Sequence, residues 1–272
     1  MRVVGRPGAG RRTVARALRG AGIAVTDPGQ DGNSHADVDV YVFVETLNAD
    51  DRVDLAASVR PTVAVLNKAD LLGLPGGVPM ASLAERCREL RREAGVAVRP
   101  LSALLAVAAS DPEVLNDATM GALRALAIGA GLDEGTRQRL AAGLDVFGAA
   151  LAVAALRGGT EPGAIAELLY SHSGIADLLG EIGRAGAVVR YRRLSGDDGV
   201  GPARIAAAGA VLDAAGVPPP TVAPSDHVGR AIHWQRYARG PVSALHRDCA
   251  LDAARGALRL WAQAGGRPAA LS

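Results

Sequence analysis

Apolar and polar positions follow two different rhythms over the first hundred or so residues. Short β-branched or aliphatic runs are expected to form strands, and the segments between them carry apolar residues at the i, i+3, i+4 spacing of a helix. This alternation predicts an α/β fold with a mostly parallel sheet and helices on both faces. The predicted strands are residues 1–4, 22–25, 37–45, 63–66 and 96–101, and the predicted helices begin near Val14 and cover residues 48–59 and 80–94.

The rest of the chain is expected to be almost entirely helical, with small and aliphatic residues at helical spacing between Gly, Pro and Asp breaks. We therefore predict an α/β domain of residues 1–109 and an all-α domain of residues 110–272. The most apolar stretch, residues 140–156, is interrupted by Asp145 and falls short of the roughly 20 residues that span a bilayer, so it is expected to be a buried helix. The predicted helices are residues 112–129, 133–156, 162–170, 175–191, 202–215, 227–237 and 242–263.

The buried strand of residues 63–66 ends in Asn67, Lys68 and Asp70, an Asn-Lys-x-Asp pattern. This pattern suits guanine, because Asp70 can accept N1–H and the exocyclic N2–H while Asn67 reaches N7 and the Lys68 stem lies along the ring. Adenine lacks these donors, which leaves Asp70 unpaired at about 1–3 kcal/mol for each unsatisfied group. Lys68 is also the only lysine in the chain, which indicates a specific need. The alternative is a strand that ends in an ordinary polar turn.

A glycine-rich loop joins the first predicted strand to the first predicted helix. Two of its glycines are five residues apart, as in G-x-x-x-x-G-K-[ST], and bare N–H groups at a helix N-terminus bind phosphate. Arg11 stands where a lysine would reach the phosphates, and Arg12 stands where a hydroxyl would bind magnesium; Thr13 follows one place later. The alternative is a plain turn between strand and helix. The glycines are Gly5, Gly8 and Gly10.

The last predicted strand ends in Ser102, Ala103 and Leu104, whose backbone N–H groups can reach the guanine O6. Ligands of parallel sheets bind at the carboxyl ends of the strands. We therefore expect this corner, the Asn-Lys-x-Asp pattern and the glycine-rich loop to share one edge of the sheet.

In their order along the chain, the glycine-rich loop, the Asn-Lys-x-Asp pattern and the corner at Ser102 to Leu104 resemble the P-loop GTPases of the Ras-like and translation-factor class. The resemblance covers roughly the first 105 residues. It implies GTP or GDP as the ligand, with magnesium, and base specificity from Asn67, Lys68 and Asp70. The departures at Arg11 and Arg12, and the lack of room for the switch segments of the family, favour a reduced, degenerate GTPase-like protein with slow or lost hydrolysis and a doubtful magnesium site.

Composition narrows the classes of function. A net charge of +2 and a pI near 8.8 are too mild for nucleic-acid binding. Cys87 and Cys249 have no metal or redox spacing and are expected to be small buried hydrophobes, and no secretory signal is recognised, so a cytoplasmic location is expected. Any membrane contact is expected to be peripheral. The four scattered histidines of the helical half predict no metal site, and no other cluster predicts one. They are His172, His227, His233 and His246.

These observations favour a guanine-nucleotide-binding protein, at most a slow GTPase, that acts as a regulatory or assembly factor and binds a protein partner or a second copy through its helical domain. A second hypothesis is a scaffold or dimerisation protein without nucleotide, in which Arg11 and Arg12 fill the phosphate pocket and pair with Asp27. A third is an active GTPase of the dynamin-like, helix-bearing type.

Overall fold

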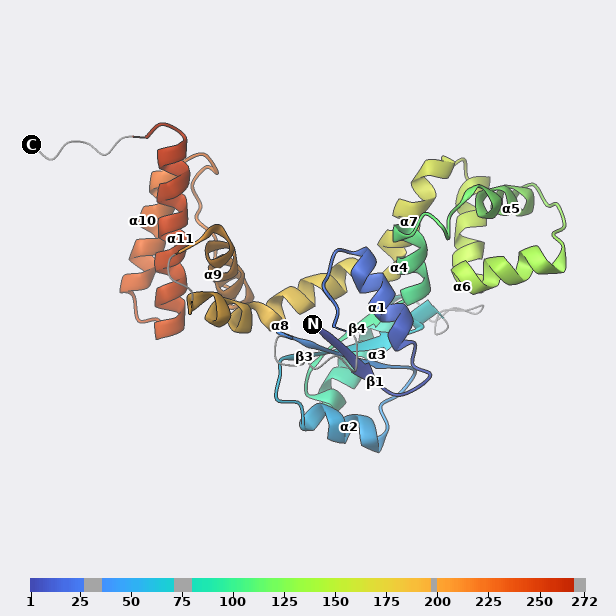
Figure 1. Ribbon diagram of the computed structural model, residues 1–272, viewed down its shortest axis with the longest axis horizontal. Helices are drawn as coiled ribbons and strands as arrows, with labels where there is room; N and C mark the ends of the chain where they lie inside the picture. Colours follow the sequence, from blue (N-terminus) through green and yellow to red (C-terminus); the bar gives the residue numbers. More distant parts are fainter. Residues whose placement is uncertain (27–35, 71–79, 197–199, 267–272) are drawn as a thin grey trace, which may run out of the picture. The chain divides into compact units, whose positions relative to one another are not determined.

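Figure 1 presents the computed structural model, which describes residues 1–26, 36–70, 80–196 and 200–266. The chain forms two compact units, Met1–Ile182 and Gly183–Ser272. The predicted domain boundary at residues 109/110 lies inside the first unit. Helices that follow the sheet in sequence pack onto the α/β part, so the first unit is larger than the predicted domain.

A parallel sheet occupies the start of the first unit, and its four strands lie in chain order. The register places Gly5 beside Val42, Val42 beside Val65, and Val65 beside Arg99. The carboxyl ends of all four strands therefore lie together, at what we call the carboxyl edge. The prediction of an α/β start with a parallel sheet, followed by helices, is confirmed. The strands are β1 (Arg2–Gly5), β2 (Asp39–Phe43), β3 (Thr62–Asn67) and β4 (Ala97–Leu101).

Helices cover both faces of the sheet. Figure 1 shows α1 and α4 on one side and α2 on the other, and α1 packs directly against α4. On the second face, Leu55 of α2 and Leu90 of α3 share a core with Tyr41 and Leu66. Every residue of β2 is buried, as expected for a strand covered on both faces. These helices are α1 (Arg11–Gly20), α2 (Ala49–Ala56), α3 (Met80–Ala94) and α4 (Ala103–Ser110).

The predicted strand at residues 22–25 is wrong. The backbone N–H groups of Gly22 and Ile23 bond back to α1, to the carbonyls of Arg19 and Leu18, and so end the helix instead of pairing with a strand. Pairing is limited to one parallel bridge between Thr26 and Arg2, on the edge of β1 opposite β2. The chain thus visits the free edge of β1 before it returns to form β2 on the other side.

The remaining helices of the first unit pack around the side of α4 that faces away from α1. Their shared core includes Leu105, Leu123, Leu144, Ile165 and Leu169, all of which are fully buried. The helix α4 itself was not predicted, because the last strand was expected to end in Ser102 to Leu104 and the next helix to begin near residue 112. These elements are α5 (Asp117–Ala127), α6 (Glu134–Arg157), the 3-10 turn η3 (Pro162–Ala164), α7 (Ile165–Ser173) and the start of α8 (Ile175–Ser195).

A sharp bend divides α6 into two helical segments (Figure 1). The bend is at Asp145, whose φ of 52° and ψ of −173° are not helical. Among the described residues, α6 is the one helix whose length and composition would suit a membrane span, and most of it is not buried. Each segment alone is shorter than the roughly 20 residues that a span requires. Burial is limited to one face, that of Leu140, Leu144, Gly148 and Ala152.

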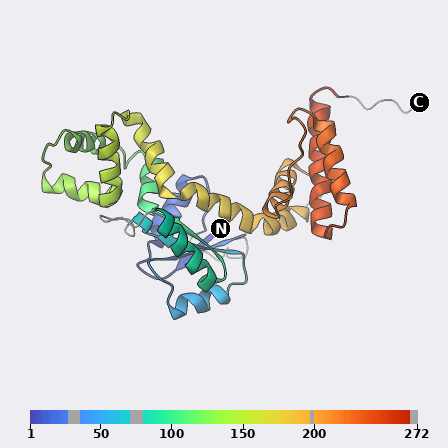
Figure 2. The same ribbon diagram turned by 180° about the vertical axis from the view of Figure 1, so that it is seen from behind.

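The second unit is helical throughout its described residues (Figure 2). Its core is built around Trp234, Tyr191 and Leu212. The packing between α9 and α11 is close, because a Cβ at Gly256 would lie 2.5 Å from a methyl group of Ile205. The helices are the end of α8 with α9 (Pro202–Ala214), α10 (His227–Arg239) and α11 (Ala244–Gln263).

Candidate functional site

The glycine-rich loop between β1 and α1 has a backbone that only glycine fits. Gly5, Gly8 and Gly10 have φ values of 125°, 81° and 85°. A Cβ at Gly5 would lie 2.1 Å from the Val42 carbonyl oxygen, and one at Gly10 would lie 2.4 Å from the Asn67 amide nitrogen. The loop therefore lies directly against the ends of β2 and β3, and side chains on its glycines would push it away.

The loop delivers the chain to an uncapped helix N-terminus. Gly10 is the N-cap of α1 in a left-handed conformation, and no side chain bonds to the first turn. The first N–H groups of a helix have no partner within the helix and attract anions. Arg11 and Arg12 are exposed, while Thr13 is partly buried. Two guanidinium groups thus stand in solvent beside free backbone donors.

Arg6 is held at the side of this loop by Asp51 of α2 and by the backbone of Thr46, which lies between β2 and α2. Its Nε lies 3.0 Å from Oδ1 of Asp51, which is fully buried, and its Nη2 donates to the Thr46 carbonyl over 3.1 Å. Asp51 also accepts from the Tyr41 hydroxyl over 2.8 Å. Burial, and then the bond to Asp51, raises the pKa of Tyr41. Arg6 is therefore positioned by its own ion pair and is not free to follow a ligand.

Asn67 joins the glycine-rich loop to the start of α4. Its side chain is 3% exposed; Nδ2 donates to the Ala9 carbonyl over 2.9 Å, and Oδ1 accepts from the Ala103 N–H over 3.3 Å. Three segments predicted to share one edge are thus tied together by one amide. Only the second hydrogen of Nδ2 remains for a contact with guanine N7, so the predicted contact would be secondary to this link.

Lys68 points into solvent at the carboxyl edge. Its φ of 57° turns the chain sharply after the buried strand. It lines a pocket of about 300 Å³ together with Arg6, Gly8 and the backbone of the glycine-rich loop. Glu45, which also has a positive φ of 61°, lines the same pocket and was not singled out from the sequence, where it was only the last residue of a predicted strand.

Asp70 lies against the corner that follows β4. Its Oδ1 accepts a hydrogen bond from Oγ of Ser102, a residue that is 4% exposed and whose own N–H donates to the Ser173 carbonyl over 2.9 Å. Leu104 belongs to the first turn of α4. The carboxylate that the sequence assigns to the guanine edge is therefore next to the N-terminus of a helix, where anions are stabilised.

Asp145, which lies 75 residues after Asp70 in the chain, reaches the same place from the bend of α6. Its carboxyl group is within hydrogen-bonding reach of Asp70, and its Oδ1 accepts from the Gly148 N–H over 2.9 Å. Burial, with a further contribution from the Asp70 charge, raises the pKa of Asp145 to about 6, although the Gly148 N–H opposes this shift. One sequence signal points to Asp145, an isolated acid in the most apolar stretch, but that signal predicts only an interruption of the stretch and not a contact with Asp70.

Magnesium does not fit the described residues of this site. No group of three or more His, Cys, Asp or Glu side chains that could hold a metal is found in the part of the chain that the structure describes. Arg12 cannot ligate a cation, and Thr13 offers a single hydroxyl. We therefore derive no chemical step through a metal ion.

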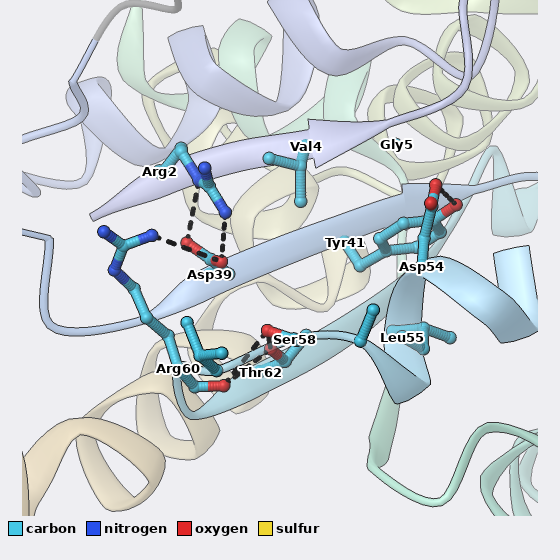
Figure 3. A pocket seen from close by; sticks show the side chains of 12 residues that line it. Arg2, Val4, Gly5, Asp39, Tyr41, Asp54, Leu55, Ser58, Arg60 and Thr62 are labelled. Carbon is cyan, nitrogen blue, oxygen red and sulfur yellow. Dashed lines mark hydrogen bonds and ion pairs between the residues drawn. The ribbon is translucent and has the colours of Figure 1, made fainter. Parts of the chain in front are cut away.

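A second hollow, of about 380 Å³, lies on the face of β1 and β2 that also packs against α2 (Figure 3). Its charged groups are paired with one another: Arg2 donates to both carboxylate oxygens of Asp39, with Nε to Oδ1 at 3.0 Å and Nη2 to Oδ2 at 2.5 Å, and Arg60 lies 4.0 Å from Asp39. Ser58 and Thr62 hydroxyls are likewise bonded, at 2.7 Å. Because these polar groups form hydrogen bonds and ion pairs with one another, this hollow has fewer polar groups available to bind a ligand than the carboxyl edge has.

Comparisons of the chain with protein-family models, curated proteins and solved structures find no match. The function must therefore be inferred from the geometry of the carboxyl edge, where the predicted residues converge.

Proposed function

We propose that this protein binds a guanine nucleotide, GTP or GDP, at the carboxyl edge of its sheet and acts as a regulatory or assembly factor with slow or lost hydrolysis. The observation that carries the proposal is the double role of Asn67, whose amide contacts both the glycine-rich loop and the corner at Ala103. The three motifs that resemble those of P-loop GTPases are thus within one amide side chain of each other.

The phosphate end of the ligand would lie at the glycine-rich loop. This placement is supported by the close approach of the loop backbone to the ends of β2 and β3, which a Cβ at Gly5 or Gly10 would prevent. So do the uncapped N-terminus of α1 and the exposed guanidinium groups of Arg11 and Arg12, which can form charge-assisted hydrogen bonds to phosphate oxygens.

The base would lie between Lys68 and Asp70. Asp70 offers carboxylate oxygens to N1–H and N2–H, and the N-terminal turn of α4, with Leu104, offers backbone donors near O6. Lys68 is exposed and free to lie along the ring. This arrangement selects guanine over adenine because adenine presents no paired donors to a carboxylate.

Hydrolysis is proposed to be slow or absent because the parts that phosphoryl transfer requires are missing from the described residues. Arg12 stands where a metal-binding hydroxyl is needed, and no metal-binding group is found there. Phosphoryl transfer depends on a metal ion and a positioned water to neutralise and direct the reacting groups. Phosphate release near zero is therefore expected even with saturating GTP.

Isothermal titration with GDP, GTP and ATP tests the proposal. We expect guanine nucleotides to bind and ATP to bind at least about tenfold more weakly, the equivalent of one lost hydrogen bond to a carboxylate. Asp70→Asn should remove the guanine preference, whereas Asp117→Asn, on an exposed turn of α5, should leave it unchanged. Absence of guanine-nucleotide binding, or a preference for ATP, would contradict the proposal.

The scaffold without nucleotide remains a second candidate, favoured by Glu45, an acid that lines the pocket beside the glycine-rich loop. Its predicted mechanism has little support, because Arg11 and Arg12 are exposed and do not line that pocket; Asp27 lies outside the described residues. Mass spectrometry of the isolated protein separates the two candidates. Bound guanine nucleotide argues for the first, and its absence together with failed titrations argues for the second.

A further inference from the structure

Asp145 is held at the bend of α6 in a backbone conformation that is unusual for its residue type. A φ of 52° with a ψ of −173° is adopted by residues other than glycine only where the surroundings impose it. The Gly148 N–H donates to Oδ1 of Asp145 and so fixes the carboxyl group at the start of the second segment of α6. The strained bend thus has one visible result, which is to place this carboxyl group against Asp70.

Asp70 is the residue that would receive the base, and its contacts are already specific. Oδ1 accepts from the Ser102 hydroxyl, and the Asp145 carboxyl group is within hydrogen-bonding reach. Two carboxyl groups in contact do not both ionise readily, and burial together with the Asp70 charge favours the protonated form of Asp145. When Asp145 is protonated, its hydroxyl donates a hydrogen bond to the Asp70 carboxylate, as a guanine N–H would.

We propose that Asp145 competes with the guanine base for the Asp70 carboxylate, so that the base site opens only when Asp145 withdraws. This inference rests on the proposed guanine site. N1–H and N2–H of the base need the oxygens that a protonated Asp145 already engages, so the two occupants exclude each other. The pair is therefore an internal competitor built into the binding site.

The charges around Asp145 come from several elements. α6 packs against α4, α5 and α7. α4 carries no titratable side chain, α5 carries Asp117 and Arg124, and α7 carries Glu167, Tyr170 and His172. α6 itself adds Glu134, Arg137, Arg139 and Arg157. The largest charge effect on Asp145 is that of Asp70.

Competition by a carboxylic acid depends on pH in a known direction. Burial raises the pKa of Asp145 to about 6, and the Asp70 charge adds to the effect. Below that pH the proton keeps Asp145 on Asp70 and opposes the base. Above it, two adjacent negative charges repel, Asp145 leaves, and Asp70 accepts the base. Affinity for the base should therefore increase as pH rises through about 6 and then level off.

Three forms of the full chain test this inference: the wild type, Asp145→Asn and Asp145→Gly. Asparagine has the shape of aspartate, so it adds no strain beyond that of the wild type, and it keeps a donor that cannot ionise. Glycine accepts the bend without strain and removes the side chain. GDP binding is measured by isothermal titration at about pH 5 and about pH 7, and circular dichroism confirms folding. The terminal phosphate of GDP also titrates with a pKa of about 6, so each affinity is divided by that of Asp145→Gly at the same pH.

From a pKa of about 6, the wild-type ratio should rise about tenfold between about pH 5 and about pH 7. The Asp145→Asn ratio should stay low at both. A wild-type ratio that does not change with pH, or Asp145→Asn binding as tightly as Asp145→Gly, overturns the competition while leaving the nucleotide site intact. Failure of all three forms to bind GDP or GTP at either pH overturns the proposed function and this inference together.

Discussion

Two acids, Asp252 in the second unit and Asp145 in the first, have opposite surroundings. In the second unit, Asp252 is fully buried and receives three hydrogen bonds: from the Tyr191 hydroxyl at 2.9 Å, from Nε of Arg204 at 2.7 Å and from Nη1 of Arg255 at 2.6 Å. Two cations surround one anion. Removing one partner of such a pair leaves an uncompensated charge, so this cluster is part of the core of the second unit.

In the first unit, Asp145 faces another acid instead of a cation. Its described contacts are Asp70 and the backbone of the second α6 segment. An arrangement of two acids is unfavourable when both are ionised, and a ligand that brings hydrogen-bond donors relieves it. Asp252, which two arginines neutralise, is therefore part of a core, whereas Asp145 and Asp70, which contact each other, lie at the candidate binding site.

The largest expected effect is that of removing Asp252, the acid that is paired with arginines. Asp252→Ala leaves Tyr191 and Arg204 without their buried partner, and should lower the free energy of unfolding of the second unit by about 3–5 kcal/mol. Both tryptophans of the chain, Trp234 and Trp261, lie in this unit, so their fluorescence during denaturant unfolding reports on it.

The matched control is Asp213→Ala, which removes an exposed aspartate from α9. It should change the free energy of unfolding by less than about 0.5 kcal/mol. Equal effects of the two substitutions would mean that the buried cluster contributes nothing beyond an ordinary surface charge.

The next effect concerns the amide that holds the site together. Asn67→Ala leaves the Ala9 carbonyl and the Ala103 N–H without their partner, which should cost the first unit about 1–3 kcal/mol and abolish tight GDP binding. Hydrogen exchange measured by mass spectrometry should be faster in peptides that cover β1 and the start of α4. Asn116→Ala, which removes the N-cap of α5, should cost about 1 kcal/mol and leave GDP binding unchanged. If hydrogen exchange became faster only in peptides of β3, the proposed link through Asn67 between the glycine-rich loop and α4 would be contradicted.

The pair of acids should make the first unit less stable as pH rises. Burial raises the pKa of Asp145 from 3.8 to about 6 in the folded state, so the folded state binds this proton more tightly than the unfolded state does. The resulting stabilisation is complete below the unfolded pKa and is lost as pH increases through about 6. Allowing for solvent screening, the loss should be about 1–2 kcal/mol. Denaturant unfolding of the wild type and of Asp145→Asn between about pH 4 and about pH 7 measures it, because the variant cannot titrate at this position. Parallel pH profiles for the two proteins would refute the raised pKa of Asp145.

How well the sequence predicts a contact depends on how far apart along the chain the two contacting segments are. The meeting of Asn67 with the glycine-rich loop follows from alternating strands and helices, because parallel strands bring their carboxyl ends to one edge. The predicted strand at residues 22–25 failed, since the end of α1 used its backbone donors. Asp145 could not be predicted, because its place depends on a bend in α6 and on packing between segments 75 residues apart. Hydrophobic periodicity specifies elements, but contacts between distant elements depend on the final packing.

The smallest expected effect is an absence of change, and it tests whether the two regions are stable independently. Each unit contains one buried thiol, Cys87 in the first and Cys249 in the second. Burial raises the pKa of both, that of Cys249 to about 11, so alkylation at about pH 8 should be slow until the surrounding unit opens. Asp252→Ala should accelerate labelling of Cys249 and leave that of Cys87 within about twofold of the wild type, because residues that share no partner contribute additively. Asn67→Ala should give the reverse pattern. Mass spectrometry of the alkylated peptides distinguishes the two sites, and acceleration at both cysteines by either substitution would show that the two units are energetically coupled.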